Sequence, residues 1–135
     1  MNIISKVVHQ KVLHTIHRKE DFQPGRVDLI DTSEFLQCAT LKLPKGTTFK
    51  AHKHVWKHGP ENVIAQESWV VIRGTVKAFY YDETGELLHT DVLCAGDASF
   101  TFFGGHNYEI MEDDTLVYEF KTGPYTGQQN DKEFI

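Results

Sequence analysis

The sequence predicts an all-β, antiparallel fold in a single domain, built as a sandwich or a barrel. Runs of β-branched and aromatic residues are short, and turn signals separate them about every 8 to 12 residues, as in such folds. The chain has 135 residues, the usual size of one domain. We see no internal repeat, linker or low-complexity segment, so one domain spanning residues 1–135 is expected.

The expected strands lie in the middle of the chain, and each ends at a turn signal. Residues 36–43 run into Pro44-Lys45-Gly46, and Asp82-Glu83-Thr84-Gly85 joins two runs as a hairpin. The full set is 36–43, 49–54, 67–73, 75–81, 86–93, 99–103, 108–111 and 115–121.

The remaining segments are assigned by composition. Residues 1–35 are expected to form a strand or a dimer arm, because helical spacing and β-branched content compete there and the latter favours a strand. Residues 55–66 contain Gly59-Pro60 and are expected to form a loop. Residues 122–135 are polar and are expected to be a surface tail.

Charge and cysteine content exclude several classes of function. The formal net charge is -5 with both signs interspersed, which argues against a nucleic-acid partner and against an anionic membrane. No run approaches the ~18 apolar residues of a membrane span. Cys38 and Cys94 have no metal-binding or redox spacing, and no secretion signal is recognisable, so a cytoplasmic location is expected.

The positions of the histidines suggest a metal-binding site. Three of the eight fall at positions 52, 54 and 58. His52 and His54 would point to the same face of a strand, because side chains alternate with period two. Glu67 opens the next expected strand, and His106 follows Gly104-Gly105. Three imidazoles and a carboxylate could surround one divalent metal ion, in a set that suits Fe, Mn, Ni, Co or Zn.

The spacing of these residues resembles the first motif of the cupin superfamily. Gly46 is followed by five residues and then by His52-Lys53-His54. Glu67 is followed by six residues and then by Gly74. Both spacings match the family pattern.

A second cupin motif is matched less closely. Gly96 is followed by five residues and then by a turn that ends at His106. Phe102 stands where the family has proline, and His106 comes one residue early. Twelve residues, 55–66, separate the ligands of the first motif where the family has three or four. The resemblance covers residues 46–106.

The resemblance implies an antiparallel cupin, a jelly-roll β-barrel, with the metal ligands His52, His54, Glu67 and His106. His58 is a rival ligand, because its loop could fold back over the ion.

Four residues are candidates for contact with a small-molecule ligand: Trp56, His58, Trp69 and Tyr108. The first two lie in the long loop and could form a lid, or the loop could be merely exposed. Trp69 shares the expected inner face with Glu67, and Tyr108 follows His106 by two residues. Both could equally be ordinary core.

The function that the resemblance implies is that of a metal-dependent enzyme acting on a small polar or carbohydrate-like metabolite, of isomerase, epimerase or lyase type. Two alternatives stay open: a non-haem Fe(II) dioxygenase, and a non-catalytic cupin that binds a small ligand. No DNA-binding segment accompanies the motifs, so a cupin-type transcription factor is not expected. A homodimer is expected, with apolar residues 3–16 taking part.

Overall fold

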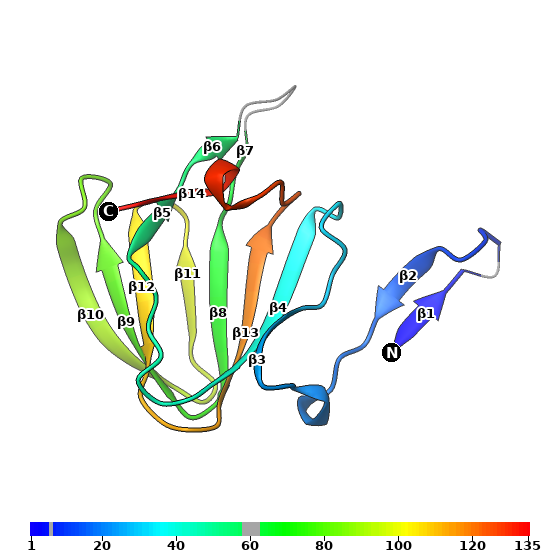
Figure 1. Cartoon of the computed structure of the whole chain (residues 1–135), viewed down its shortest axis with the longest axis horizontal. Coiled ribbons are helices and arrows are strands. Elements are labelled where there is room, and N and C mark those ends of the chain that lie inside the picture. The colour runs from blue at the N-terminus through cyan, green and yellow to red at the C-terminus, as the bar shows by residue number, and fades with distance from the viewer. Residues whose placement is uncertain (6, 58–62) are drawn as a thin grey trace.

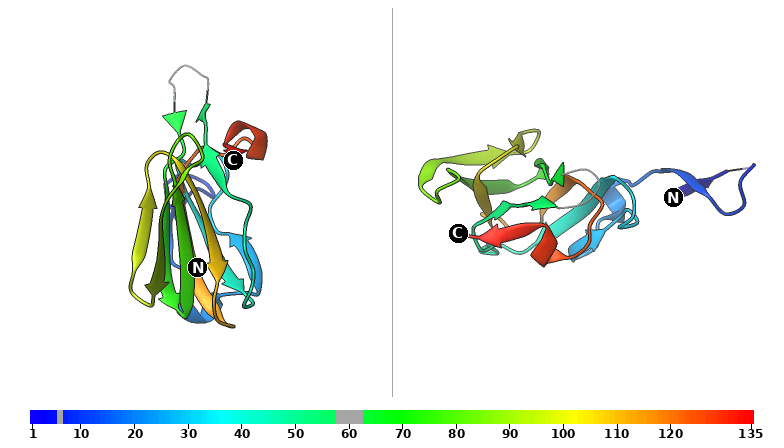
Figure 2. Two further views of the ribbon diagram at one scale, coloured as in Figure 1. Left: turned by 90° about the vertical axis from the view of Figure 1, so that its left-hand side faces the viewer. Right: turned by 90° about the horizontal axis from the view of Figure 1, so that it is seen from above.

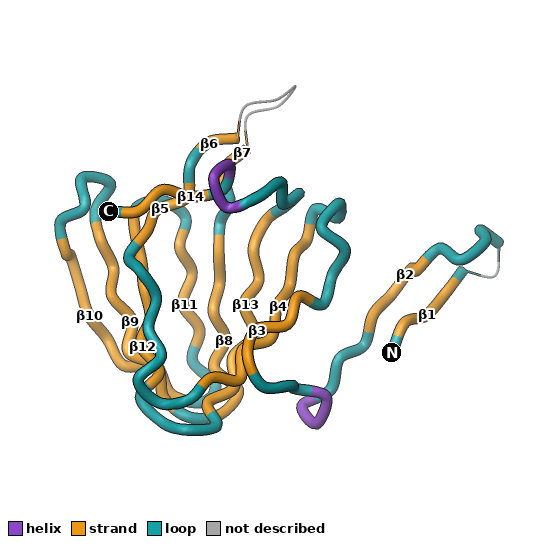
Figure 3. Tube along the Cα trace, viewed as in Figure 1, coloured by secondary structure: helices purple, strands orange, loops and turns teal. Residues whose placement is uncertain are grey.

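The computed structural model of the chain describes residues 1–5, 7–57 and 63–135, and nearly all of its regular structure is strand (Figures 1 and 3). Two 3-10 turns cover Lys19–Asp21 and Gln128–Asn130. The strands are β1 (Asn2–Ile4), β2 (Val12–Thr15), β3 (Gly25–Asp28), β4 (Leu36–Leu43), β5 (His52–His54), β6 (Trp56–Lys57), β7 (Val63–Ile64), β8 (Glu67–Arg73), β9 (Thr75–Tyr81), β10 (Leu87–Cys94), β11 (Ala98–Thr101), β12 (Gly105–Ile110), β13 (Thr115–Thr122) and β14 (Lys132–Phe134).

Two five-stranded sheets make up the body of the molecule. One has the order β10-β9-β12-β5-β14 and the other has the order β11-β8-β13-β4-β3. The strand pairings within both sheets are antiparallel. The all-β, antiparallel prediction is therefore confirmed, including the hairpin formed by β9 and β10.

The core lies between the two sheets, because each contributes its inner face to one apolar cluster. Trp69 and Val71 alternate with outward residues along β8, as period-two geometry requires. They meet Val76 on β9 and Tyr108 and Ile110 on β12, from the opposite sheet. Full burial of such a side chain contributes about 1.5–3 kcal/mol to the free energy of folding. This shared core fixes how far apart the sheets stand.

Gly74 allows the chain to pass from one sheet to the other. It lies between β8 and β9, which belong to different sheets. Its φ of +85° is in the left-handed region, and a Cβ at this position would collide with Thr115. Only glycine fits both constraints.

Both ends of the chain contain strands of their own. Residues 1–35 form a two-stranded hairpin, β1–β2, that extends away from the sheets, and a separate strand β3 (Figures 1 and 2). Residues 122–135 were expected to lie on the surface, yet β14 pairs with β5 and Asp131 is fully buried. Strand β14 satisfies the edge of β5 that would otherwise be unpaired.

The expected loop 55–66 begins and ends as a short ladder between β6 and β7, and residues 58–62 lie outside the described residues. Within the described part of the chain, no helix has the length and apolar character needed to cross a membrane.

Candidate metal centre

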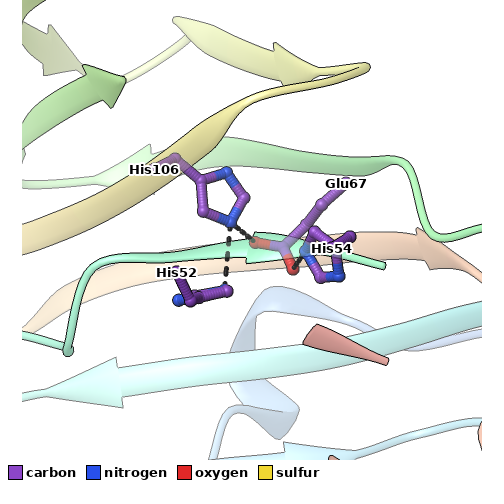
Figure 4. Close-up of side chains that lie close together, drawn as sticks. All are labelled: His52, His54, Glu67 and His106. Carbon is purple, nitrogen blue, oxygen red and sulfur yellow. Dashed lines mark hydrogen bonds and ion pairs between the residues drawn. The ribbon is translucent and has the colours of Figure 1, made fainter. Parts of the chain in front are cut away.

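Three strands bring the four predicted ligands together (Figure 4). His52 and His54 both face inward from β5, as their spacing predicts. Strand β12 lies beside β5 and places His106 directly opposite His52. Glu67 is the first residue of β8 and reaches the cluster from the opposite sheet.

The donor atoms of these four side chains converge on one small volume. One ligand atom from each residue lies within 4.8 Å of all the others. Nε2 of His106 is 3.2 Å from Nε2 of His52 and 3.4 Å from Oε1 of Glu67. Nε2 of His54 is 3.3 Å from Oε2 of Glu67. All four residues are buried.

Hydrogen bonds on the other ring nitrogens orient the imidazoles. Nδ1 of His52 donates to the backbone oxygen of Lys50 at 2.9 Å. Nδ1 of His106 lies 2.7 Å from Oγ1 of Thr101, which can accept. A neutral ring that donates from Nδ1 carries its lone pair on Nε2. The Nε2 lone pairs of His52 and His106 therefore face each other across the cluster.

Two facing nitrogen lone pairs repel each other, so a cation between the rings would stabilise this arrangement. Burial, followed by the positive neighbours each ring has, lowers the pKa of His52 to about 4 and that of His106 to about 3. Neither ring is therefore protonated to the charged imidazolium at neutral pH. Nε2 of His54 faces the same point and lies beside the carboxylate of Glu67. Three imidazole nitrogens and one carboxylate, facing one point, fit a divalent metal ion.

His54 has a carboxylate behind it that the sequence did not reveal. Its Nδ1 lies 3.2 Å from both the backbone oxygen and Oδ2 of Asp131. Burial alone would lower the pKa of His54, but hydrogen bonds to Asp131 and Glu67 raise it to about 9. A carboxylate behind a histidine ligand is a common second partner of metal sites.

Asp131 is held in turn by two lysines. Nζ of Lys57 lies 2.9 Å from Oδ1 of Asp131, and Nζ of Lys121 lies 3.5 Å from Oδ2. Burial would raise the pKa of Asp131, but His54, Lys121 and Lys57 together hold it well below its usual range. The carboxylate is therefore ionised and points at His54.

A cavity of about 310 Å³ opens beside the cluster. His52 and Glu67 line one side of it. Polar and charged side chains line much of the rest, among them Arg26, Gln37, Glu119, Lys121, Gln128 and Lys132.

Glu119 is a buried carboxylate in this cavity that is not part of the ligand cluster. Nη2 of Arg26 lies 2.8 Å from its Oε1. Nε1 of Trp69 donates to Oε2 of Glu119 at 3.2 Å and to Oε1 of Glu67 at 3.1 Å. One indole N–H thus connects Glu119 to Glu67, one of the four predicted ligands. Sequence reasoning missed both Glu119 and Arg26.

The four candidate ligand-contact residues are placed differently. Trp69 and Tyr108 line the cavity, but their rings stack on each other at 4.0 Å within the core. Trp56 is half-exposed beside Phe103 and does not line the cavity described here. His58 lies outside the described residues, so its role as a rival ligand stays a prediction.

Comparison with known proteins gives matches among solved structures. No protein-family model and no curated protein matches the sequence. The chain is similar to KdgF from Halomonas sp. with 18% identity and a TM-score of 0.56, over 77% of this chain and 81% of that one. A protein of Bacillus halodurans matches with 15% identity and a TM-score of 0.62, over 80% and 76% of the two chains.

An oxalate decarboxylase variant from Bacillus subtilis matches with 19% identity and a TM-score of 0.60. The match covers 84% of this chain and 29% of the decarboxylase. The chain thus spans less than a third of that enzyme. At these identities the likeness establishes a shared fold.

Proposed function

We propose that this chain, which has the cupin fold shared by these solved structures, is a metal-dependent enzyme acting on a small polar or carbohydrate-like metabolite. The proposal rests on one observation: three histidine nitrogens and a glutamate converge beside a polar cavity. We infer chemistry of the isomerase, epimerase or lyase type, because Glu119, a carboxylate outside the predicted ligand set, stands in the same cavity.

Each part of the cavity has a chemical task in this proposal. His52, His54, Glu67 and His106 would hold the ion, which when bound would polarise a substrate oxygen. Glu119 would accept a proton from the substrate carbon at a carboxylate oxygen and return it. Proton transfer by a positioned side chain contributes about 10²- to 10⁴-fold to a rate.

Two neighbours prepare Glu119 for that task. The guanidinium of Arg26 holds one carboxylate oxygen and the indole N–H of Trp69 holds the other. Both donate, so they hold the carboxylate in one orientation within the cavity. Because Trp69 also donates to Glu67, it fixes the distance between the proton acceptor and the metal ligands.

The cavity suits a small polar compound. A volume of about 310 Å³ is at the lower end of small-molecule sites. Gln128 and Lys132 offer hydrogen-bond donors to hydroxyl or carboxylate groups. One structural neighbour is by name an oxalate decarboxylase, which fits a small acid as one class to test.

The test begins with elemental analysis of protein purified without chelator. Metal-loaded protein is then incubated in D₂O with sugars, sugar acids and hydroxy or keto acids, and NMR follows deuterium incorporation next to a carbonyl. Glu119→Gln should keep its metal and lose exchange at least about 100-fold. Glu133→Gln, at an exposed position on β14, should keep both.

Other outcomes would count against the proposal. Exchange that persists in Glu119→Gln would remove that residue from the mechanism. Bound iron with substrate-dependent oxygen consumption would indicate a dioxygenase instead. Tight binding of a compound that is never converted would indicate a non-catalytic binding protein.

A further inference from the structure

Lys132 faces the cavity from β14, the strand that lies against β5 near the C-terminus (Figure 1). It stands directly opposite His54 in the antiparallel register of β14 and β5. Residues in such opposite positions project to the same face of a sheet. His54 is buried on the inner face, so Lys132 projects inward too, and it lines the cavity together with His52 and Glu67.

The positive charge of Lys132 acts on two of the predicted metal ligands. Burial is the largest cause of the lowered pKa of His52 and of His106, and the charge of Lys132 lowers each of them further. A divalent ion bound at the centre would outweigh the single negative charge of Glu67. The loaded centre and Lys132 would then both be positive and would repel each other. An anionic group placed between them would be attracted by both.

The other cations of the cavity already have partners. Nη2 of Arg26 lies 2.8 Å from Oε1 of Glu119, and Nζ of Lys121 lies 3.5 Å from Oδ2 of Asp131. Within residues 1–5, 7–57 and 63–135, no side chain forms an ion pair or a hydrogen bond with the ammonium of Lys132. The three N–H donors of this half-buried group are therefore available to a ligand.

A ligand in this cavity would meet opposite charges on two walls. Lys132 comes from the sheet that contains β14, and Glu119 comes from β13 of the facing sheet. The carboxylate of Glu119 repels the anionic end of a ligand, and the ammonium of Lys132 attracts it. The anionic end should therefore lie against Lys132, which leaves the rest of the ligand facing Glu119.

We propose that Lys132 binds the carboxylate of a 2-hydroxy or 2-oxo acid whose oxygen at carbon 2 lies at the metal centre. The anionic group must be close to the metal-bound oxygen, because the charge of Lys132 reaches the ligands themselves. A single ammonium matches the single charge of a carboxylate, and a cavity of about 310 Å³ suits an acid of few carbons. This inference rests on the proposed function, since it assigns a substrate class to the same cavity.

Isothermal titration calorimetry on the full chain loaded with Zn²⁺ tests the proposal by binding alone. Glycerate is compared with glycerol, and pyruvate with hydroxyacetone, because each neutral compound replaces the carboxylate by CH₂OH. The wild-type protein should bind each acid at least about tenfold more tightly than its neutral partner, as expected for hydrogen bonds to a charged group. Lys132→Met should lose this preference, and Lys132→Arg should retain it.

Lys53→Met is the matched control for the loss of one positive charge. Lys53 lies on β5 between the two histidines, but its ammonium pairs with the exposed Glu133 at 2.9 Å and is not among the residues that line the cavity. This variant should retain the preference for the acids. All variants should retain one zinc ion per chain in elemental analysis. If Lys132→Met loses its metal, Lys132→Gln serves in its place.

Several outcomes would overturn the proposal. They are a wild-type protein that binds acids and neutral partners equally, a preference that survives in Lys132→Met, and a preference lost to the same extent in Lys53→Met. Inorganic phosphate that binds more tightly than glycerate and depends on Lys132 would replace the carboxylate by a phosphate group and would also overturn it.

The same experiment separates this inference from the proposed function. Acids that bind through Lys132 but show no deuterium exchange would count against the enzyme and leave the carboxylate subsite in place. Exchange in neutral sugars, without any preference for acids, would support the enzyme and overturn the subsite.

Discussion

Replacing Asp131 by asparagine should weaken metal binding while leaving the fold intact. Asparagine has nearly the same size, and the backbone oxygen of residue 131 still accepts the Nδ1–H of His54. What is lost is the negative charge 3.2 Å behind the ring. The pair is almost completely buried, with side-chain exposures of 3% and 1%, so solvent screens it little.

The expected loss is about 10- to 100-fold in metal affinity, the usual effect of removing an outer partner of a histidine ligand, or about 1.4–2.7 kcal/mol. The full loss should appear only above pH 9. In the metal-free wild-type protein the raised pKa of about 9 means that His54 holds a proton at pH 7. An incoming ion must displace it, which weakens apparent binding by roughly 100-fold at that pH.

The substitution relieves part of that competition. Without the carboxylate the pKa of His54 falls, so a smaller fraction of the rings is protonated at pH 7. The metal ion then meets less competition from protons, which at pH 7 partly offsets the affinity lost with the carboxylate. Affinity should be measured at both pH values by competition between metal-free protein and a chromophoric chelator. The control is Glu133→Gln, whose ion pair with Lys53 is exposed and contributes little. Equal affinities of the two variants above pH 9 would refute the reasoning.

Three further predictions follow from the site and its scaffold. Changing both His52 and His54 to alanine should abolish metal binding in elemental analysis, and full occupancy would contradict the ligand assignment. The apparent metal affinity of the wild-type protein should rise about tenfold per pH unit from pH 7 to pH 9, because binding releases one proton from His54, and should level off above its pKa of about 9; a flat profile in chelator competition would contradict this. Gly46→Ala should cost about 1–2 kcal/mol of unfolding free energy for its φ of +83° alone, since no atom lies within 4 Å of the new Cβ. Gly74→Ala should cost about 1–3 kcal/mol more, because it also collides with Thr115; equal midpoints in urea would contradict that difference.

The sequence alone predicted those features of this protein that depend on local periodicity. Alternation along β5 places His52 and His54 on one face whatever the rest of the chain does, because side chains of a strand repeat every two residues. The same rule placed Trp69 beside Glu67 on the inner face of β8. The hairpin of β9 and β10 followed from its turn residues.

The tertiary structure decided which distant segments meet. Asp131 stands in a stretch with no apolar pattern, and it reaches His54 only because β14 pairs with the exposed edge of β5. Glu119 alternates along β13 like any inward residue, and nothing local indicates that Arg26 lies against it. The exposed placement of the hairpin β1–β2 was equally beyond local patterns. Strand pairing between distant segments depends on the free energy of the whole fold, because loop closure costs little more for a distant partner than for a near one. A local pattern predicts which face of its strand a side chain takes, but it does not predict which strand will lie beside it.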